Sequence, residues 1–189
     1  MVKQERNFDN GRYPLNPMKR QEPAESSVVK QITVLLADDH AGFRKSLRRL
    51  IESHGDIRVV GEARDGSEAV RLAESLRPDV IIMDIAMPML NGFQATQQIL
   101  ESLPTTRVLI LSANPDPEYI RQAAVLGASG YLIKQASAHV FAQALREVSK
   151  GKTYFSTSIP HRLRDECQKL FVRAKRKVAR TALCTASLA

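Results

Sequence analysis

The sequence between residues 32 and 151 alternates five times between a short apolar run and a longer segment with helical spacing. The apolar runs cover residues 32–37, 57–60, 79–84, 107–111 and 131–133. Short, continuously apolar runs are typical of strands that are buried on both faces of a parallel sheet. Strands that alternate with helices are joined by right-handed βαβ crossovers. We therefore predict an α/β fold, a doubly wound five-stranded parallel sheet with helices on both faces.

Short motifs between these segments indicate where the helices begin and end. Asp116 followed by Pro117 is an N-cap with proline at the first helical position. Ser67 and Ser137 can cap the second and fifth helices with their hydroxyl oxygens. A glycine, which can adopt the left-handed conformation that often ends a helix, follows the first, fourth and fifth helical segments. These residues are Gly55, Gly127 and Gly151.

The positive charge of the chain is concentrated at its C-terminal end. The sequence has 28 Lys and Arg residues against 20 Asp and Glu residues, a formal net charge of +8. Residues 32–150 carry a net charge of −1, whereas residues 1–31 carry +2 and residues 151–189 carry +7. A basic end of this kind indicates either a segment that meets an acidic partner, such as nucleic acid, or a solvated helix face. The charge is therefore evidence about the tail alone.

The composition divides the chain into three parts. Residues 1–31 are polar, contain three prolines and have no apolar period, which predicts a flexible leader. Residues 32–152 form the predicted α/β domain, and residues 153–189 form a tail. Apolar residues recur in the tail at helical spacing, which predicts one basic amphipathic helix. The 38 residues after Gly151 are too few to hold the core of a further helical domain without additional stabilisation.

The sequence also indicates the compartment. No run approaches the ~20 apolar residues that a membrane-spanning helix needs. The N-terminal residues are charged and have no apolar core of the kind found in secretory signals. The two cysteines, Cys167 and Cys184, form neither a disulfide framework nor a zinc-binding pattern. We expect a cytoplasmic protein with no membrane contact.

Polar side chains stand at the ends of four of the five predicted strands. Asp38 and Asp39 follow the first strand, Asp84 ends the third, Ser112 follows the fourth and Lys134 follows the fifth. Functional residues in open parallel sheets gather at the carboxyl ends of the strands, beside the point where the strand order reverses. We therefore expect these five side chains to form one site.

The residue types in this set indicate phosphate chemistry. Crowded carboxylates need a cation, and oxygen ligands favour Mg²⁺ or Mn²⁺ over zinc. A lysine balances the remaining charge, and a hydroxyl can donate a hydrogen bond to an added anion. Together they provide a nucleophile, a metal site and donors for phosphate oxygens. Asp84, which ends a buried apolar run, is unfavourable there unless it is paired, and this too indicates a functional site.

The same motifs resemble the receiver domain of bacterial two-component response regulators, in particular the NarL/FixJ type. The resemblance covers residues 32 to about 152 and implies a flavodoxin-like (βα)₅ fold. It is carried by Asp38-Asp39, the run from Asp84 to Gly92, Ser112-Ala113 and the segment from Ala128 to Lys134. Lys134 is followed by Gln135, where many receivers have proline, so we expect the turn that carries Lys134 to differ in detail.

The resemblance implies a role for each matching side chain. Asp84 is the expected phosphoacceptor, with Lys134 and Ser112 as the expected contacts of the phosphoryl group. Ser112 and Tyr131 are the expected switch residues. Ser112 is expected to turn toward the new phosphate, while Tyr131 rotates inward. This rotation would remodel the face made by the fourth helix, the fifth strand and the fifth helix.

The cofactor and partners follow from the same resemblance. The implied ligands of Mg²⁺ or Mn²⁺ are the carboxylates of Asp38, Asp39 and Asp84 and the backbone carbonyl of Ala86. The implied phosphodonor is a histidine kinase, a phosphotransfer protein or a small phosphodonor, and a homodimer is compatible with the family. No turnover of a separate substrate is expected, so the protein is not expected to be an enzyme.

Two other functions stay open at this point. NarL/FixJ-type regulators usually continue into a helix-turn-helix domain. One alternative is therefore a DNA-binding transcriptional regulator whose output domain is truncated or replaced by the basic tail, which would bind DNA weakly and with strong salt dependence. The other is a phosphatase with an aspartate nucleophile. The acidic residues and the lysine suit such an enzyme, but the sequence has no cap insertions.

Overall fold

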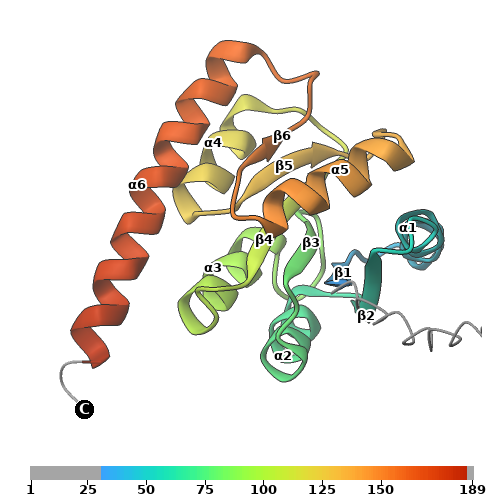
Figure 1. The fold of residues 1–189 in the computed structure, drawn as a ribbon, viewed down its shortest axis with the longest axis horizontal. Coiled ribbons are helices and arrows are strands. Elements are labelled where there is room, and N and C mark those ends of the chain that lie inside the picture. Colours follow the sequence, from blue (N-terminus) through green and yellow to red (C-terminus); the bar gives the residue numbers. More distant parts are fainter. Residues whose placement is uncertain (1–30, 187–189) are drawn as a thin grey trace, which may run out of the picture.

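The computed structural model describes residues 31–186, with side chains described up to residue 174. Its strands are β1 (Ile32–Ala37), β2 (Ile57–Ala63), β3 (Val80–Asp84), β4 (Arg107–Ser112), β5 (Gly130–Ile133) and β6 (Tyr154–Phe155). Its helices are α1 (Ala41–Glu52), α2 (Gly66–Leu76), α3 (Gly92–Ser102), α4 (Pro117–Leu126), α5 (Ala138–Ser149) and α6 (His161–Ala186). The strands form one parallel sheet in the order β2-β1-β3-β4-β5-β6 (Figure 1).

The predicted doubly wound α/β fold is confirmed, with one strand more than the sequence indicated. The additional strand, β6, pairs with β5, so that Gly130 lies opposite Tyr154. Two residues are too short a run to show a periodic pattern, which is why the strand was not predicted. The approach is close, because a Cβ atom at Gly130 would lie only 2.1 Å from the carbonyl oxygen of Tyr154. Glycine is therefore required at this point of the sheet.

Helices cover both faces of the sheet, and the alternation of side chains along each strand divides the core in two. Leu35 on β1 belongs to a cluster with residues of α2, α3 and α4. Its neighbours Val34 and Leu36 belong to the opposite cluster, with residues of α1 and α5. Successive strand residues point to opposite faces, so both sides of a buried strand must be apolar. This explains the continuous apolar runs from which the fold was predicted.

The helix boundaries confirm one predicted cap and correct another. Asp116 caps α4 by accepting a hydrogen bond from the backbone of Glu118, and Gly127 ends that helix in the left-handed conformation. The prediction for Ser67 was wrong, because Asp65 is the N-cap of α2 and accepts from the backbone of Glu68. Ser137 stands at the N-cap of α5, but its side chain makes no capping hydrogen bond.

The basic amphipathic helix predicted in the tail is present as α6, which packs along α4 (Figure 1). Its buried side chains include Leu163, Cys167 and Phe171. Leu163 and Cys167 belong to the same core cluster as residues of α2, α3 and α4. The tail helix is thus part of the packed domain over its first half. The domain boundaries themselves remain a prediction, and the leader lies outside the described residues except for Gln31.

No helix among the described residues is long and apolar enough to cross a membrane.

A partly exposed ion pair joins the loop before β2 to α5, 90 residues further along the chain. Arg146 donates two hydrogen bonds to Asp56, at 2.6 and 2.8 Å. These bonds lower the pKa of Asp56 below its ordinary value near 3.8. The carboxylate therefore stabilises the fold at neutral pH, and the stabilisation is lost as the pH falls through the lowered pKa.

We expect Asp56→Asn to lower the free energy of unfolding at pH 7, because it removes the negative charge that Arg146 binds. The loss should be about 1 kcal/mol, since both side chains are about one-third exposed. The difference from the wild type should shrink as the pH falls below about 4. Urea denaturation between pH 7 and pH 3 measures this. Arg146→Lys, which keeps the charge but loses the two-pronged geometry, should give a smaller loss. A difference that is independent of pH would contradict the assignment.

Candidate functional site

The predicted site lies where the order of strands in the sheet reverses. β1 leads to β2 on one side, and β3 continues to β4 on the other. In the β1–β3 ladder Ala37 lies opposite Met83. Asp38, the residue after β1, and Asp84, the last residue of β3, therefore lie at the same level at the carboxyl edge. Both are 3% exposed, and this edge is where ligands bind in doubly wound folds.

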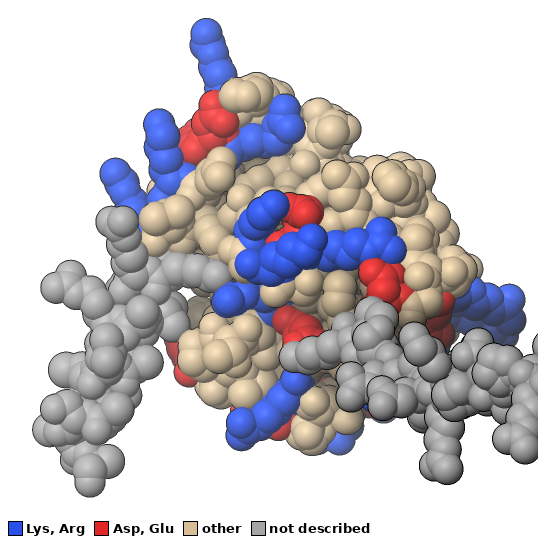
Figure 2. Space-filling view, in the orientation of Figure 1, with Lys and Arg blue, Asp and Glu red and all other residues tan. Residues whose placement is uncertain are grey.

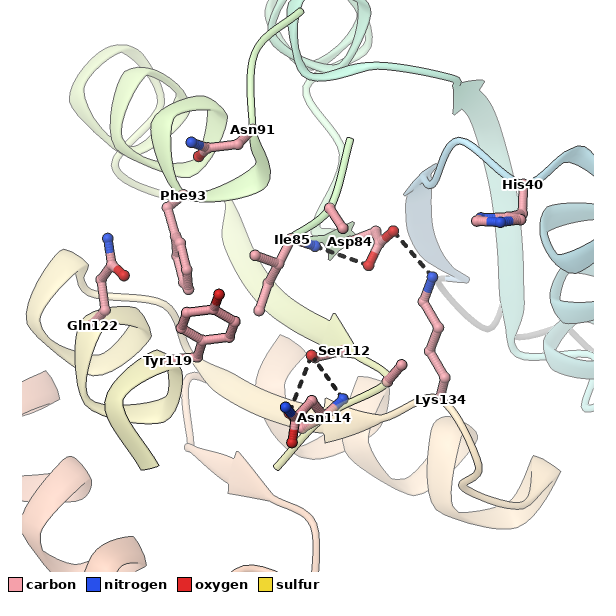
Figure 3. A pocket seen from close by; sticks show the side chains of 12 residues that line it. His40, Asp84, Ile85, Asn91, Phe93, Ser112, Asn114, Tyr119, Gln122 and Lys134 are labelled. Atoms are coloured by element: carbon pink, nitrogen blue, oxygen red, sulfur yellow. Dashed lines mark hydrogen bonds and ion pairs between the residues drawn. The ribbon is translucent and has the colours of Figure 1, made fainter. Parts of the chain in front are cut away.

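A single ammonium group contacts both buried carboxylates. The Nζ atom of Lys134 lies 2.8 Å from Oδ2 of Asp38 and 3.0 Å from Oδ2 of Asp84 (Figure 3). The lysine follows β5, and its side chain reaches across the end of β4 to the two acids. Its Nζ also lies 5.2 Å from the centre of the Phe43 ring on α1. Three strands and one helix thus fix one positive charge between two negative ones.

The pKa values of Asp84 and Lys134 are displaced by this arrangement. Burial raises the pKa of Asp84, although the hydrogen bond and charge of Lys134 oppose the rise. Burial lowers the pKa of Lys134, but its bonds to Asp38 and Asp84 exceed this effect, and the net pKa is raised. The lysine therefore stays charged at neutral pH. The other carboxylate oxygen of Asp84, Oδ1, accepts one hydrogen bond among the described residues, from the backbone N–H of Ile85 at 2.9 Å.

The residues predicted to hold Mg²⁺ provide oxygen donors at this edge. Oxygen ligands of Asp38 and Asp39, together with a nitrogen of His40, lie within 4.8 Å of one another. Asp84 lies beside this group, because Lys134 contacts both Asp84 and Asp38. None of the described hydrogen bonds uses the carbonyl of Ala86, which lines the cavity at Asp84. Carboxylates with a free carbonyl suit a hard divalent cation, so the donor set fits Mg²⁺.

His40 is the one residue of this group that was not predicted as a ligand. Its Nδ1 atom lies 2.6 Å from Oδ1 of Asp39, and its backbone N–H donates to Oδ1 of Asp38 at 2.8 Å. His40 is the N-cap residue of α1, and its side chain is mostly exposed. It therefore orients the two acids as well as lining the mouth of the cavity.

The loop after Asp84 is held against the strand end by a close backbone approach. Gly92 N–H donates to the carbonyl of Ile85 at 3.0 Å. A Cβ atom at Gly92 would lie 1.9 Å from the carbonyl oxygen of Asp84. Only glycine permits this contact. Asn91 then caps α3, in a capping box with Gln94. The motif from Asp84 to Gly92 therefore folds back on the residue that begins it.

Ser112 and Tyr131 meet at one backbone group. Ser112 Oγ donates to the carbonyl of Asn114 and accepts its N–H, each at 3.1 Å (Figure 3). The hydroxyl of the fully buried Tyr131 donates to the same carbonyl at 2.9 Å. Burial raises the pKa of Tyr131, with an opposing effect from its contact with Ser112. In this structure Tyr131 already lies inward, and Ser112 is turned to Asn114 rather than to Asp84.

One wall of the cavity beside Asp84 was not predicted from the sequence. The cavity has a volume of about 610 Å³ and extends from Asp84 and Lys134 past Ser112 to Phe93, Tyr119 and Gln122. Phe93 lies at the start of α3, and Tyr119 and Gln122 lie one turn apart on α4. Tyr119 and Gln122 carry no local signal, because an aromatic and an amide on a helix are ordinary surface residues.

Known proteins are similar to this chain in sequence and in fold. The family model for the response regulator receiver domain matches residues 34–146. The chain is 36% identical over 140 residues to the transcriptional regulatory protein DegU of Brevibacillus brevis, covering 74% of this chain and 59% of DegU. It is 41% identical over 128 residues to the transcriptional regulatory protein LiaR of Bacillus subtilis, covering 68% and 61%. The chain thus spans about three-fifths of the length of these curated relatives.

A solved structure shows the same similarity. The signal receiver domain of the putative response regulator NarL from Mycobacterium tuberculosis aligns with a TM-score of 0.62 and 35% sequence identity. The alignment covers 65% of this chain and 99% of that domain. The similarity is therefore to a complete receiver domain.

Proposed function

The chain belongs to the response regulator receiver domain family, and we propose on that basis that Asp84 accepts a phosphoryl group from a histidine kinase, a phosphotransfer protein or a small phosphodonor. Receivers of this family act in two-component systems and are not catalytic enzymes. One observation carries the assignment to Asp84. Its buried carboxylate shares the ammonium of Lys134 with Asp38 at the point where the strand order reverses. This is a nucleophile beside a fixed positive charge.

Each residue of the site then has a part in the transfer. A carboxylate oxygen of Asp84 forms the new O–P bond while the bond from phosphorus to the donor breaks. Lys134 is placed to contact a phosphoryl oxygen, because its ammonium already lies 3.0 Å from Asp84. Asp38, Asp39, Asp84 and the carbonyl of Ala86 would hold Mg²⁺. When bound, the ion supplies positive charge that offsets the charge of the phosphoryl oxygens.

Ser112 links the new phosphate to the rest of the domain. A phosphoryl group adds about −1.5 to −2 charges near pH 7 and offers acceptor oxygens. Turning Ser112 toward it would break both hydrogen bonds of Ser112 with Asn114. Tyr131 would then remain as the side chain that holds the Asn114 carbonyl. Because Asn114 lies two residues before the cap of α4, the change would be passed to that helix.

The proposed output of the switch is α6. The predicted switch face of α4, β5 and α5 is partly covered in this structure, because α6 packs on α4 and β6 pairs with β5. Arg121 on α4 contacts Glu166 on α6 at 3.0 Å, and the Sγ atom of Cys167 lies 3.8 Å from the carbonyl oxygen of Ile120. A shift of α4 would therefore strain or release these contacts.

We expect acetyl phosphate with Mg²⁺ to add one phosphate to the full chain, as measured by intact-protein mass. Asp84→Asn should abolish the addition, because it removes the nucleophile. Lys134→Gln should slow it by about 10- to 100-fold, since it removes a preorganised charge. Asp165→Asn, which changes an exposed carboxylate on α6, is the matched control and should label at the wild-type rate. Full labelling of Asp84→Asn would refute the assignment.

A second prediction tests whether the signal reaches α6. The sequence has two cysteines, so a Cys184→Ser background leaves Cys167 as the single thiol. Cys167 is fully buried, and burial raises the pKa of its thiol to about 11. We expect beryllofluoride, a mimic of the phosphoryl group, to change the rate of thiol labelling by at least fivefold, with an increase if α6 is released. The Asp84→Asn variant should show no response. An unchanged rate in the Asp84 protein would exclude α6 as the output.

One observation favours a second candidate, nucleic-acid binding by α6. The helix buries its apolar face on α4 and exposes Arg162, Lys169 and Arg173 on the other side. Figure 2 shows Lys and Arg side chains along this part of the helix, with acidic side chains among them. The curated relatives named above are transcriptional regulators. Basic side chains on a projecting helix suit contact with phosphates.

Neutralising charge tests this candidate better than truncation does, since cutting at residue 152 would remove β6 and core residues of α6. We expect the triple change Arg162→Gln, Lys169→Gln and Arg173→Gln to weaken binding to duplex DNA at least tenfold at low salt and to flatten its salt dependence. Electrophoretic mobility shifts across a salt series measure both. The control is Arg64→Gln, which changes an exposed arginine just after β2, at the other edge of the sheet. Equal binding by the two variants would exclude α6 as the contact.

A further inference from the structure

The cavity at Asp84 is larger than a phosphoryl group needs, and its far end has a definite chemistry. The end near Asp84 is polar, with Lys134 and Ser112. The other end is formed by Phe93 of α3 and by Tyr119 and Gln122 of α4. Figure 3 shows these three side chains together on one side of Ile85, with Asp84 and Lys134 on the other. The cavity therefore joins a phosphate-binding end to an aromatic end.

The aromatic end is built from a packed ring pair. The centres of the Phe93 and Tyr119 rings are 5.8 Å apart with an angle of 71° between the planes, an edge-to-face arrangement. Phe93 is 7% exposed and fixed in the core, whereas Tyr119 is 42% exposed. The core thus holds the inner ring, and the outer ring keeps surface free for a ligand. Edge-to-face packing fixes the orientation of Tyr119 before any ligand arrives.

Two polar groups at this end are available to a ligand. Tyr119 and Gln122 lie at positions i and i+3 of α4, on the same face of the helix. None of the described hydrogen bonds uses the Tyr119 hydroxyl or the Gln122 amide. The Gln122 amide carries both a donor and an acceptor. A flat ring beside a free amide suits a planar ligand with nitrogen atoms in its ring.

We propose that Phe93, Tyr119 and Gln122 form a subsite for the leaving group of the phosphodonor, and that the ligand it fits is an imidazole ring. The proposal rests on the proposed function of Asp84. The ring could come from free phosphoimidazole or from a phosphorylated histidine of a protein. In either case the ring packs on Tyr119, and the Gln122 amide oxygen accepts the N–H of the ring nitrogen that does not carry phosphorus.

The transfer balances with the groups named. A carboxylate oxygen of Asp84 forms the O–P bond as the N–P bond of the donor breaks. The electron pair of the N–P bond stays on the ring nitrogen. The ring carries a proton on its other nitrogen before transfer, so it leaves as neutral imidazole. Tyr119 and Gln122 are specificity residues in this step, because they contact the leaving group and not the phosphorus.

The test compares two donors that differ in their leaving group. Phosphoimidazole carries a ring, and phosphoramidate carries only an amino group. The full chain is phosphorylated with each donor in Mg²⁺, and the ratio of the two initial rates is measured. We expect Tyr119→Ala to lower this ratio about tenfold, which is the size expected for one ring contact. Tyr119→Phe, which keeps the ring, should hold the ratio within twofold of wild type, and Gln122→Ala should lower it about threefold.

Three outcomes are informative beyond this. An unchanged ratio in Tyr119→Ala, with phosphoramidate still labelling Asp84, would overturn the subsite and leave the phosphoacceptor assignment intact. A ratio that falls in His40→Ala instead would place the ring on the α1 side of the cavity and also overturn the proposal. A peptide carrying phosphohistidine distinguishes the sources. The same loss with the peptide assigns the subsite to histidine donors in general, and loss with phosphoimidazole alone restricts it to free imidazole.

Discussion

The contact of one lysine with two buried carboxylates is the interaction on which the site depends. Asp38 and Asp84 end neighbouring strands at the same level of the ladder, and two negative charges so close and so buried repel each other. Lys134 makes the pair tolerable by lying within 3.0 Å of both. Removing Lys134 would leave the two buried carboxylates without a compensating positive charge, which is strongly unfavourable. The lysine therefore allows the fold to keep the proposed phosphoacceptor, Asp84, buried at this edge of the sheet.

The second half of the proposed switch depends on a backbone carbonyl rather than on charge. Ser112 and Tyr131 both hydrogen-bond the carbonyl of Asn114, so they share one acceptor in the loop that leads to α4. In the proposed switch, a turn of the Ser112 side chain would remove its hydrogen bonds to that loop. Ile120 and Arg121 of α4 in turn contact Cys167 and Glu166 of α6. A short chain of contacts thus joins the site proposed to accept phosphate on β3 to the position of α6.

The sequence predicted those parts of the molecule that local patterns determine. Apolar runs gave the strands, and their ends gave Asp38, Asp84 and Lys134, because in a parallel sheet strand ends meet at one edge. The strand β6 was missed because two residues carry no period. Ser67 was predicted as the cap of α2, whereas Asp65 caps it; both residue types cap helices, and the backbone decides which of them does so. Tyr119 and Gln122 were missed because their role comes from tertiary packing of α4 beside α3.

The position of α4 explains why these missed residues matter. One face of the helix, with Ile120 and Ala123, is buried in the core that α6 completes. The adjacent face, with Tyr119 and Gln122, lines the cavity that reaches Asp84. A ring bound on the second face and a helix packed on the first face therefore act on the same rigid element. A ligand shifts an equilibrium only through different contacts in the two states of the protein. The proposed donor binding and the proposed release of α6 would therefore be coupled through α4, without any further moving part.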